Sequence, residues 1–243
     1  MKATPILRTK NLVKAYSHKR VVNNVNIEVY RGEVVGLLGP NGAGKTTTFY
    51  MTTGFVRPDK GNIYLGKRNI TNLSMHKRAI LGLGYLPQQP SVFQKLTVED
   101  NLMAILELQN LTMKQRNKKK DMLLEDLHIT KLAKKQAWML SGGERRRLEI
   151  ARSLVTSPSI ILFDEPFSGV DPIAVAEVQS IIQKLKKKKI GILLTDHNVR
   201  EILSTTDRSY LIYEGRILKS GTSDFLANDD EAKKIYLGEK FSM

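Results

Sequence analysis

One stretch of eight residues restricts the folds open to this chain more than any other feature. It reads Gly39-Pro40-Asn41-Gly42-Ala43-Gly44-Lys45-Thr46, fits the pattern G-x-x-x-x-G-K-[ST] and follows the wholly apolar run 34–38. Such a run is typical of a buried strand, and the residues after Thr46 are typical of a helix. The glycines let several backbone N–H groups point at one anion, and the helix N-terminus adds the positive end of its dipole. The stretch therefore predicts a strand–loop–helix unit that cradles the phosphates of a nucleoside triphosphate.

Two side chains of this loop have separate expected roles. Lys45 is expected to reach the β- and γ-phosphates, and Thr46 to place its hydroxyl on Mg²⁺. The full set of expected nucleotide contacts in the loop is Gly39, Pro40, Asn41, Gly42, Ala43, Gly44, Lys45, Thr46 and Thr47.

Adjacent carboxylates end another apolar run, "IILFDEP", which carries Asp164 and Glu165. In a doubly wound sheet, the carboxyl ends of the strands lie beside the phosphate loop. We expect Asp164 to hold the magnesium shell, and Glu165 to orient and polarise the attacking water. His197, just past the next apolar run in "ILLTDHN", is expected to reach the γ-phosphate. The plainer alternatives are an acidic turn and a surface histidine.

A second glycine-containing helix start lies in "LSGGERRRLEIARSL", residues 140–154. Ser141 is placed as an N-cap, with free amides at Gly142 and Gly143 and a capping-box partner at Glu144. The chain thus carries two predicted anion cradles, with Lys45 and Ser141 separated by 141 − 45 = 96 positions.

The remaining patterns predict an α/β core with a helical insert. Strands are expected at 25–29, 34–38, 160–163 and 190–194, and a hairpin turns at Glu214-Gly215. Helices are expected from Thr97, whose partner Asp100 makes a capping-box pattern, and from about 172 to 187. We expect one domain over 1–243, with an α/β core of 1–94 and 156–243 and a helical subdomain at about 95–155.

Composition narrows the setting of the protein. The 243 residues are 41% hydrophobic and 26% charged, as in folded soluble domains. The chain has no cysteine, which excludes disulfides and thiolate metal sites and favours a reducing cytosol. Its start lacks the apolar stretch of a signal peptide, and no apolar run approaches the about 20 residues that span a bilayer.

The net charge of +15 is concentrated in lysine runs at 118–120, 134–135 and 186–189. Solvated helix faces, attraction to anionic lipid and attraction to nucleic acid would each account for these runs. Composition does not separate the three.

The order of the motifs resembles that of the nucleotide-binding subunits of ABC transporters. The phosphate loop, "LSGGE", "ILFDEP", "SGVD" and "DH" follow one another as in that family, over nearly the whole chain. The resemblance implies a P-loop NTPase of ABC type: a RecA-like α/β core, an antiparallel β subdomain and an inserted α-helical subdomain. It also implies that Tyr16 stacks on adenine and that Gln88 contacts Mg²⁺ and the attacking water and senses the transport partner. Asp171 would couple the two sites of a dimer.

In this family the "LSGG" segment of one subunit caps the ATP that the phosphate loop of the other subunit holds. The resemblance therefore implies a head-to-tail homodimer in which Ser141, Gly142 and Gly143 complete the partner's site. The chain departs from the family at Glu144, where glutamine is usual. The family resemblance also implies that the chain is a peripheral protein on the cytoplasmic face of the inner membrane. Two integral permease subunits would dock near Val92 and Phe93. At Phe93, an apolar contact left open for a partner competes with simple core packing.

Within the family, "LSGGERRRLEIARSL", "DEPFSGVDP", "LLTDHNVRE" and "IYLGEKF" resemble the ATPases that drive lipopolysaccharide from the inner membrane toward the outer membrane. One alternative is the ATPase of branched-chain amino-acid importers, which has a similar layout. The other is a DNA-acting ABC-type ATPase, suggested by the charge. Those proteins carry a long coiled coil, zinc-binding cysteines or two tandem domains, which this chain lacks. No specific nucleic-acid partner is expected.

Overall fold

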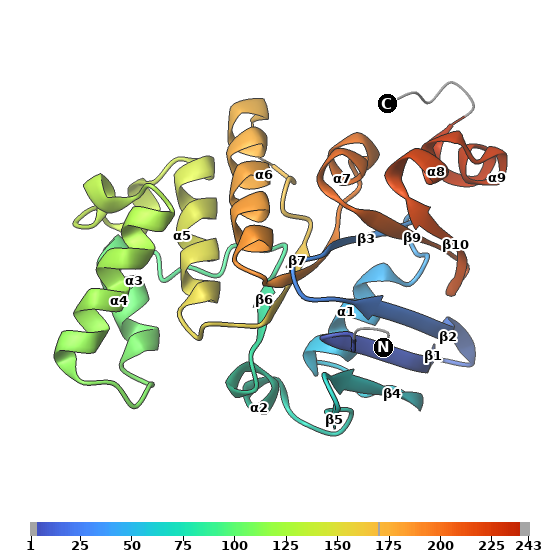
Figure 1. Cartoon of the computed structure of the whole chain (residues 1–243), viewed down its shortest axis with the longest axis horizontal. Coiled ribbons are helices and arrows are strands. Elements are labelled where there is room, and N and C mark those ends of the chain that lie inside the picture. The colour runs from blue at the N-terminus through green and yellow to red at the C-terminus, as the bar shows by residue number, and fades with distance from the viewer. Residues whose placement is uncertain (1–3, 170, 239–243) are drawn as a thin grey trace.

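The computed structural model describes residues 4–169 and 171–238. Its strands are β1 (Leu7–Tyr16), β2 (Lys19–Val29), β3 (Val34–Leu38), β4 (Lys60–Leu65), β5 (Arg68–Asn69), β6 (Leu83–Leu86), β7 (Ile160–Asp164), β8 (Gly191–Thr195), β9 (Arg208–Tyr213) and β10 (Arg216–Thr222). Its α-helices are α1 (Lys45–Thr53), α2 (Met75–Ile80), α3 (Val98–Leu106), α4 (Met113–Asp126), α5 (Gly142–Leu154), α6 (Pro172–Lys187), α7 (Val199–Thr205), α8 (Ser223–Asn228) and α9 (Asp230–Ala232) (Figure 1). Val170 of "SGVD", the end of "IYLGEKF" and both ends of the expected domain lie outside the described residues.

Two sheets form the core of the described chain. The larger has the order β10-β9-β3-β8-β7-β6, in which β3, β6, β7, β8 and β9 run parallel and β10 returns antiparallel to β9. The smaller is antiparallel, with the order β2-β1-β4-β5. Every residue of β3, β7 and β8 is buried, which explains the apolar runs that make up β3 and precede the polar last residues of β7 and β8. The expected α/β class and the hairpin at Glu214-Gly215 are confirmed.

The period-2 alternation of the parallel strands distributes their side chains over two apolar layers. Val35 and Leu37 of β3 pack with α1 and the smaller sheet, whereas Val34 and Leu38 pack toward α6 and α7. Figure 1 shows these layers, with α6 and α7 on one side of the larger sheet and α1, β1 and β2 on the other. The loops at the carboxyl ends of the strands therefore extend from a sheet whose two faces are both packed.

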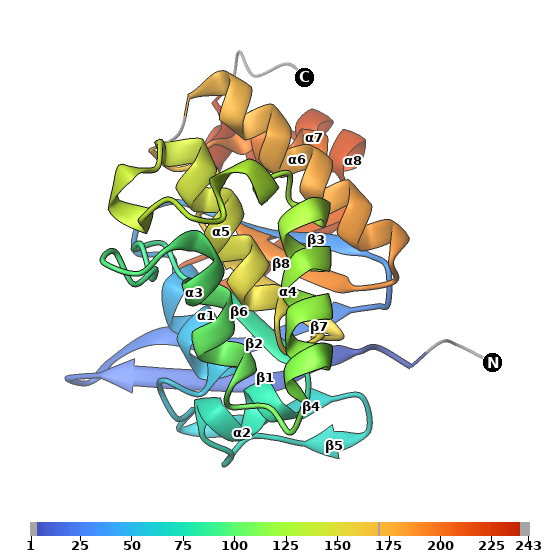
Figure 2. The same ribbon diagram turned by 90° about the vertical axis from the view of Figure 1, so that its left-hand side faces the viewer.

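A helical region occupies one end of the molecule, where α3, α4 and α5 lie together (Figure 2). The expected cap at Thr97 is confirmed, because its hydroxyl accepts a hydrogen bond from the Asp100 amide. The reciprocal half of that capping box is absent among the described contacts. Asp100 bonds the Thr97 hydroxyl instead, since aspartate is one methylene shorter than the glutamate that the box requires. The boundaries at 95 and 155 stay a prediction.

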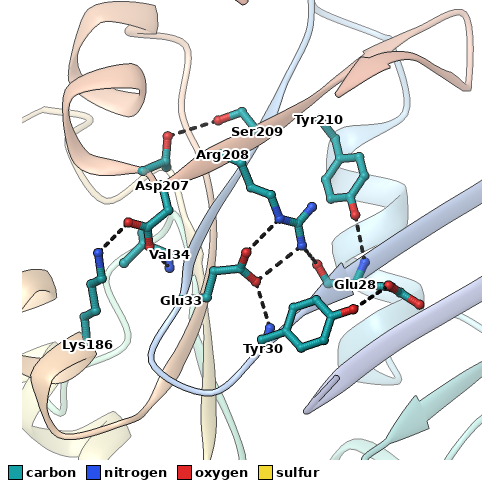
Figure 3. A network of polar contacts seen from close by, with 10 residues as sticks. Glu28, Tyr30, Glu33, Val34, Lys186, Asp207, Arg208, Ser209 and Tyr210 are labelled. Atoms are coloured by element: carbon teal, nitrogen blue, oxygen red, sulfur yellow. Dashed lines mark hydrogen bonds and ion pairs between the residues drawn. The ribbon is translucent and has the colours of Figure 1, made fainter. Parts of the chain in front are cut away.

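A polar network ties the two sheets together at the amino end of β3 (Figure 3). The Arg208 guanidinium donates to Glu33 Oε1 at 2.7 Å and to the Glu28 carbonyl of β2 at 2.6 Å. The neighbouring Asp207 accepts from the Val34 amide at 2.9 Å and pairs with Lys186 at the end of α6. This network lies at the opposite end of β3 from the phosphate loop, so it fixes the layers without entering the site.

Ion pairs account for part of the lysine runs. Lys188 lies 2.7 Å from Asp126, and Lys120 and Lys134 both contact Glu99. Between residues 4 and 238, leaving out Val170, no helix is long and apolar enough to cross a bilayer.

Candidate nucleotide-binding site

The phosphate loop connects β3 to α1, as expected. Gly44 is the N-cap of α1 with a φ of 104° and no side-chain cap, so the first amides of the helix are open to an anion. A Cβ on Gly44 would lie 2.4 Å from the Val21 carbonyl oxygen. Both the left-handed backbone and the close approach of β2 therefore require glycine at this position.

A cleft of about 230 Å³ lies over this loop, lined by Val21, Asn41, Gly42, Ala43, Gly44, Lys45, Thr46, Thr47 and Glu165. The Lys45 ammonium donates to the carbonyls of Gly39 and Pro40, at 2.6 and 3.0 Å. Burial lowers the pKa of Lys45, and the nearby Glu165 and Asp164 carboxylates act against that change. The cleft thus combines free amides with a half-buried cation, which suits a phosphate chain. The sequence did not predict Val21 as a cleft residue, because no local pattern distinguishes it from the other valines of β2.

Asp164 is the last residue of β7 and is only 4% exposed. Burial raises its pKa to about 6, while a hydrogen bond from the Tyr85 hydroxyl to Oδ2, at 3.2 Å, acts in the opposite direction. Tyr85 was also missed by the sequence reasoning. A tyrosine near the end of an apolar run carries no local signal that it reaches a carboxylate on the next strand.

Three of the expected catalytic side chains meet at one oxygen atom. Gln88 Nε2 donates to Glu165 Oε2 at 2.6 Å, and His197 Nδ1 lies 3.4 Å from the same oxygen. Glu165 has a φ of 49°, and its amide donates to the Thr195 carbonyl at 2.8 Å, which holds this uncommon backbone conformation. The ends of β6, β7 and β8 thus converge as a doubly wound sheet requires.

The second cradle is well formed but stands apart from the first. The Ser141 hydroxyl accepts from the Glu144 amide at 3.2 Å, and the Glu144 carboxylate accepts from the Ser141 amide at 2.9 Å. The expected capping box is therefore confirmed. Asp171 caps α6 by accepting from the amides at 173 and 174, at 3.0 Å each. Of the described residues that line the phosphate cleft, none comes from 141–143 or from Asp171.

Tyr16 lies at the end of β1 with 47% of its surface exposed, so it is not a core residue. The Lys14 ammonium lies 5.5 Å from the centroid of its ring. The ring is not among the described residues lining the phosphate cleft, and its contact with adenine stays a prediction.

Of the two apolar residues near which docking is expected, Val92 is buried and Phe93 is exposed, and the docking itself stays a prediction. Val92 is 9% exposed and belongs to the core cluster that includes residues of α3 and α5. Phe93 is 49% exposed and lies against the Arg152 guanidinium, whose carbon is 4.7 Å from the ring centroid. Core packing therefore does not explain Phe93.

The model of the family described as ABC transporter matches residues 22–168. The chain belongs to the ABC transporter family. It is 50% identical over 238 residues to "Lipopolysaccharide export system ATP-binding protein LptB" of Acidithiobacillus ferridurans, covering 98% of this chain and 99% of that one. It is 49% identical over 238 residues to the protein of that name in Escherichia coli (strain K12), with the same coverage. A crystal structure of an ATP-binding cassette of an ABC transporter, in its ADP conformation, superposes with a TM-score of 0.88 at 30% identity, covering 98% of this chain and 100% of that one.

Membership in the ABC transporter family confirms the fold inferred from the motifs. The chain is an ATP-binding subunit of an ABC transporter, and its activity is that of an ATPase.

Proposed function

We propose that this ABC transporter subunit hydrolyses ATP to drive lipopolysaccharide export from the inner membrane toward the outer membrane. The observation that carries the proposal is the identity of about half, over nearly the full length of both chains, to relatives named as lipopolysaccharide export ATP-binding proteins. The phosphate cleft and the carboxylates beside it support ATP hydrolysis as the driving step.

Glu165 acts as the general base toward the attacking water. Its carboxylate borders the phosphate cleft, and Gln88 and His197 hold the oxygen that would face the water. Lys45 supplies positive charge to the β- and γ-phosphates. The approach of the three side chains to one atom makes the water's position depend on all of them.

Asp164 and Thr46 fit a magnesium ion bound with ATP. Mg²⁺ keeps several waters and takes one or two protein oxygens together with substrate phosphates, so it does not need a dense acidic cage. The described residues contain no such cage of three or more His, Cys, Asp or Glu side chains. The ion would neutralise developing charge on the phosphates. Asp164 supplies a buried carboxylate for its shell, and Thr46, an exposed residue, lines the cleft.

The active form is a head-to-tail homodimer. The open amides after Ser141 and the phosphate cleft belong to separate parts of one chain, so each can complete a site with a second copy. ATP that binds the closed dimer better than the open one shifts the population toward closure, and loss of the γ-phosphate reverses it. Asp171, at the start of α6, couples the two sites. In this scheme the helical subdomain of about 95–155 carries the second cradle.

Two integral membrane subunits dock beside Gln88, which places the chain on the cytoplasmic face of the inner membrane. A cavity of about 440 Å³ opens there, lined by Tyr50, Phe55, Val56, Tyr85, Pro87, Gln88, Gln89 and Asp164. The exposed Phe93 follows a few residues later and offers an apolar anchor. Movement of a partner segment bound in this cavity would displace Gln88, which lines it.

Phe93→Ala is expected to leave the isolated chain folded and active but to weaken its complex with the membrane subunits by about 2–4 kcal/mol. In the free protein the ring is 49% exposed and lies against the Arg152 guanidinium, so its removal costs little there, whereas in the complex the partner's pocket would lose its anchor. Affinity measured in detergent tests this. Leu108→Ala, at an 86% exposed position just after α3, is the control and is expected to have no effect. A lower melting temperature with unchanged affinity would place the docking site elsewhere.

Lys45→Ala is expected to weaken ATP binding at least about 30-fold, because removing a partly buried cation leaves the phosphate charge uncompensated. Equilibrium binding of a fluorescent ATP analogue measures the effect. Lys60→Ala removes an exposed lysine of β4 and should leave affinity unchanged. Equal affinities of the Lys45 variant and the unmodified chain would contradict the phosphate-loop assignment.

Depletion of the chain from its host tests the transport role. Newly made lipopolysaccharide is expected to accumulate in the inner-membrane fraction, while uptake of radiolabelled leucine continues. Loss of leucine uptake with normal lipopolysaccharide delivery would instead identify the chain as part of a branched-chain amino-acid importer.

A further inference from the structure

Tyr85 lies on the same face of the larger sheet as Asp164. In the parallel pair of β6 and β7, Tyr85 is opposite Leu162, and Asp164 follows two residues later. Because side chains alternate with a period of two, all three lie on the face toward α1. The Tyr85 hydroxyl lies 3.2 Å from Asp164 Oδ2, which leaves Oδ1 without a bond from Tyr85.

The Tyr85 ring is itself held by aromatic neighbours. Its edge meets the Phe55 ring, with centroids 5.9 Å apart and planes at 70°, and Phe55 contacts Tyr50 at 5.6 Å. All three rings and Asp164 line the cavity of about 440 Å³ beside Gln88. These ring contacts orient the Tyr85 ring that presents the hydroxyl to the carboxylate, at a cavity where Phe55 is 57% and Tyr50 38% exposed.

We propose that Tyr85 is a positioning residue for the ATPase reaction, whose hydroxyl orients the Asp164 carboxylate toward the divalent cation bound with ATP. The inference rests on the proposed role of Asp164 in the magnesium shell. A carboxylate that contributes to a cation shell binds better when its other oxygen is hydrogen-bonded, because the bond fixes its rotamer and the direction of its free lone pairs. Tyr85 touches neither the nucleotide nor the cation in this arrangement, and it acts only through Asp164.

Tyr85→Phe removes the hydroxyl and keeps the ring, so it isolates this contact. Binding of a fluorescent, non-hydrolysable ATP analogue is measured in EDTA and in Mg²⁺, and the ratio of the two affinities gives the contribution of the cation. The variant is expected to keep its affinity in EDTA and to lose about 10–100-fold of the gain that Mg²⁺ provides. Electron paramagnetic resonance with Mn²⁺ as the probe gives a second reading of cation binding that does not depend on turnover.

Tyr50→Phe is the matched control, because it removes a hydroxyl from the same cavity and no described contact joins Tyr50 to Asp164. It is expected to keep the full gain from Mg²⁺. Asp164→Asn separates the two hypotheses. If Asp164→Asn keeps the Mg²⁺ gain, the proposed magnesium site is wrong. If Asp164→Asn loses the gain while Tyr85→Phe keeps it, the site stands and the role of Tyr85 is overturned. A weaker affinity of Tyr85→Phe in EDTA, with an unchanged ratio, would also overturn it, as a purely structural effect.

Discussion

Glu165→Gln is expected to slow ATP hydrolysis by about 10²–10⁴-fold and to leave ATP binding intact. Glutamine has the shape of glutamate and can still accept the hydrogen bond from Gln88, but it cannot take a proton from water. Single-turnover hydrolysis and equilibrium binding measure the two effects separately. Glu107→Gln, at an exposed position at the end of α3, is expected to change neither. Full activity in the Glu165 variant would remove Glu165 from the reaction.

Glu165→Gln is also expected to accumulate as a dimer in MgATP, because hydrolysis no longer opens the closed state. Light scattering coupled to gel filtration measures its mass with and without ATP. Adding Ser141→Arg should prevent the dimer, since a long cation would fill the space over the amides that cap the partner's ATP. Ser74→Arg, at the exposed N-cap of α2, is the matched control and should leave the dimer intact. A monomer in every condition would contradict the shared-site arrangement.

Arg78→Met is expected to lower the free energy of unfolding by about 3–5 kcal/mol, the largest stability effect that we predict. Arg78 is 1% exposed, and its guanidinium donates to the carbonyls of Met51, Thr52, Thr71 and Leu73 at 2.6–2.9 Å. Two of these carbonyls belong to the last turn of α1, where a cation also meets the negative end of the helix dipole. Burial lowers the pKa of Arg78 only to about 10, so the cation is kept at neutral pH.

Urea unfolding followed by circular dichroism measures this loss. Methionine fills much of the space of the arginine stem but leaves buried carbonyl oxygens without a donor, so the loss reports the hydrogen bonds. Lys77→Met changes the adjacent, exposed cation of the same helix and is expected to stay within about 0.5 kcal/mol of the unmodified chain. Similar stabilities for the two variants would show that Arg78 does not hold α1.

The local elements of this protein could be read from its sequence. The bounds of β3, of α6 and of the hairpin after β9 agree with their apolar runs, their turn residues and the N-cap at Asp171. The capping box of Ser141 and the left-handed glycine before α1 follow from residues only a few positions apart. These features depend on backbone geometry and short-range hydrogen bonds, which a few neighbouring residues settle.

The tertiary structure alone decided which distant residues share an environment. Gln88 reaches Glu165 across 77 positions, and Tyr85 reaches Asp164 across 79, because the register of β6 on β7 brings those strand ends together. Motif resemblance pointed to the first pair, but no local pattern marked the second. No local pattern predicted the burial of Val92 and Phe93 either. They are adjacent apolar residues in the loop before α3, yet Val92 is buried and Phe93 is exposed. Burial depends on what the rest of the chain packs against a residue, so the sequence determined the local elements and the candidate chemistry, while only long-range packing decided the contacts between them.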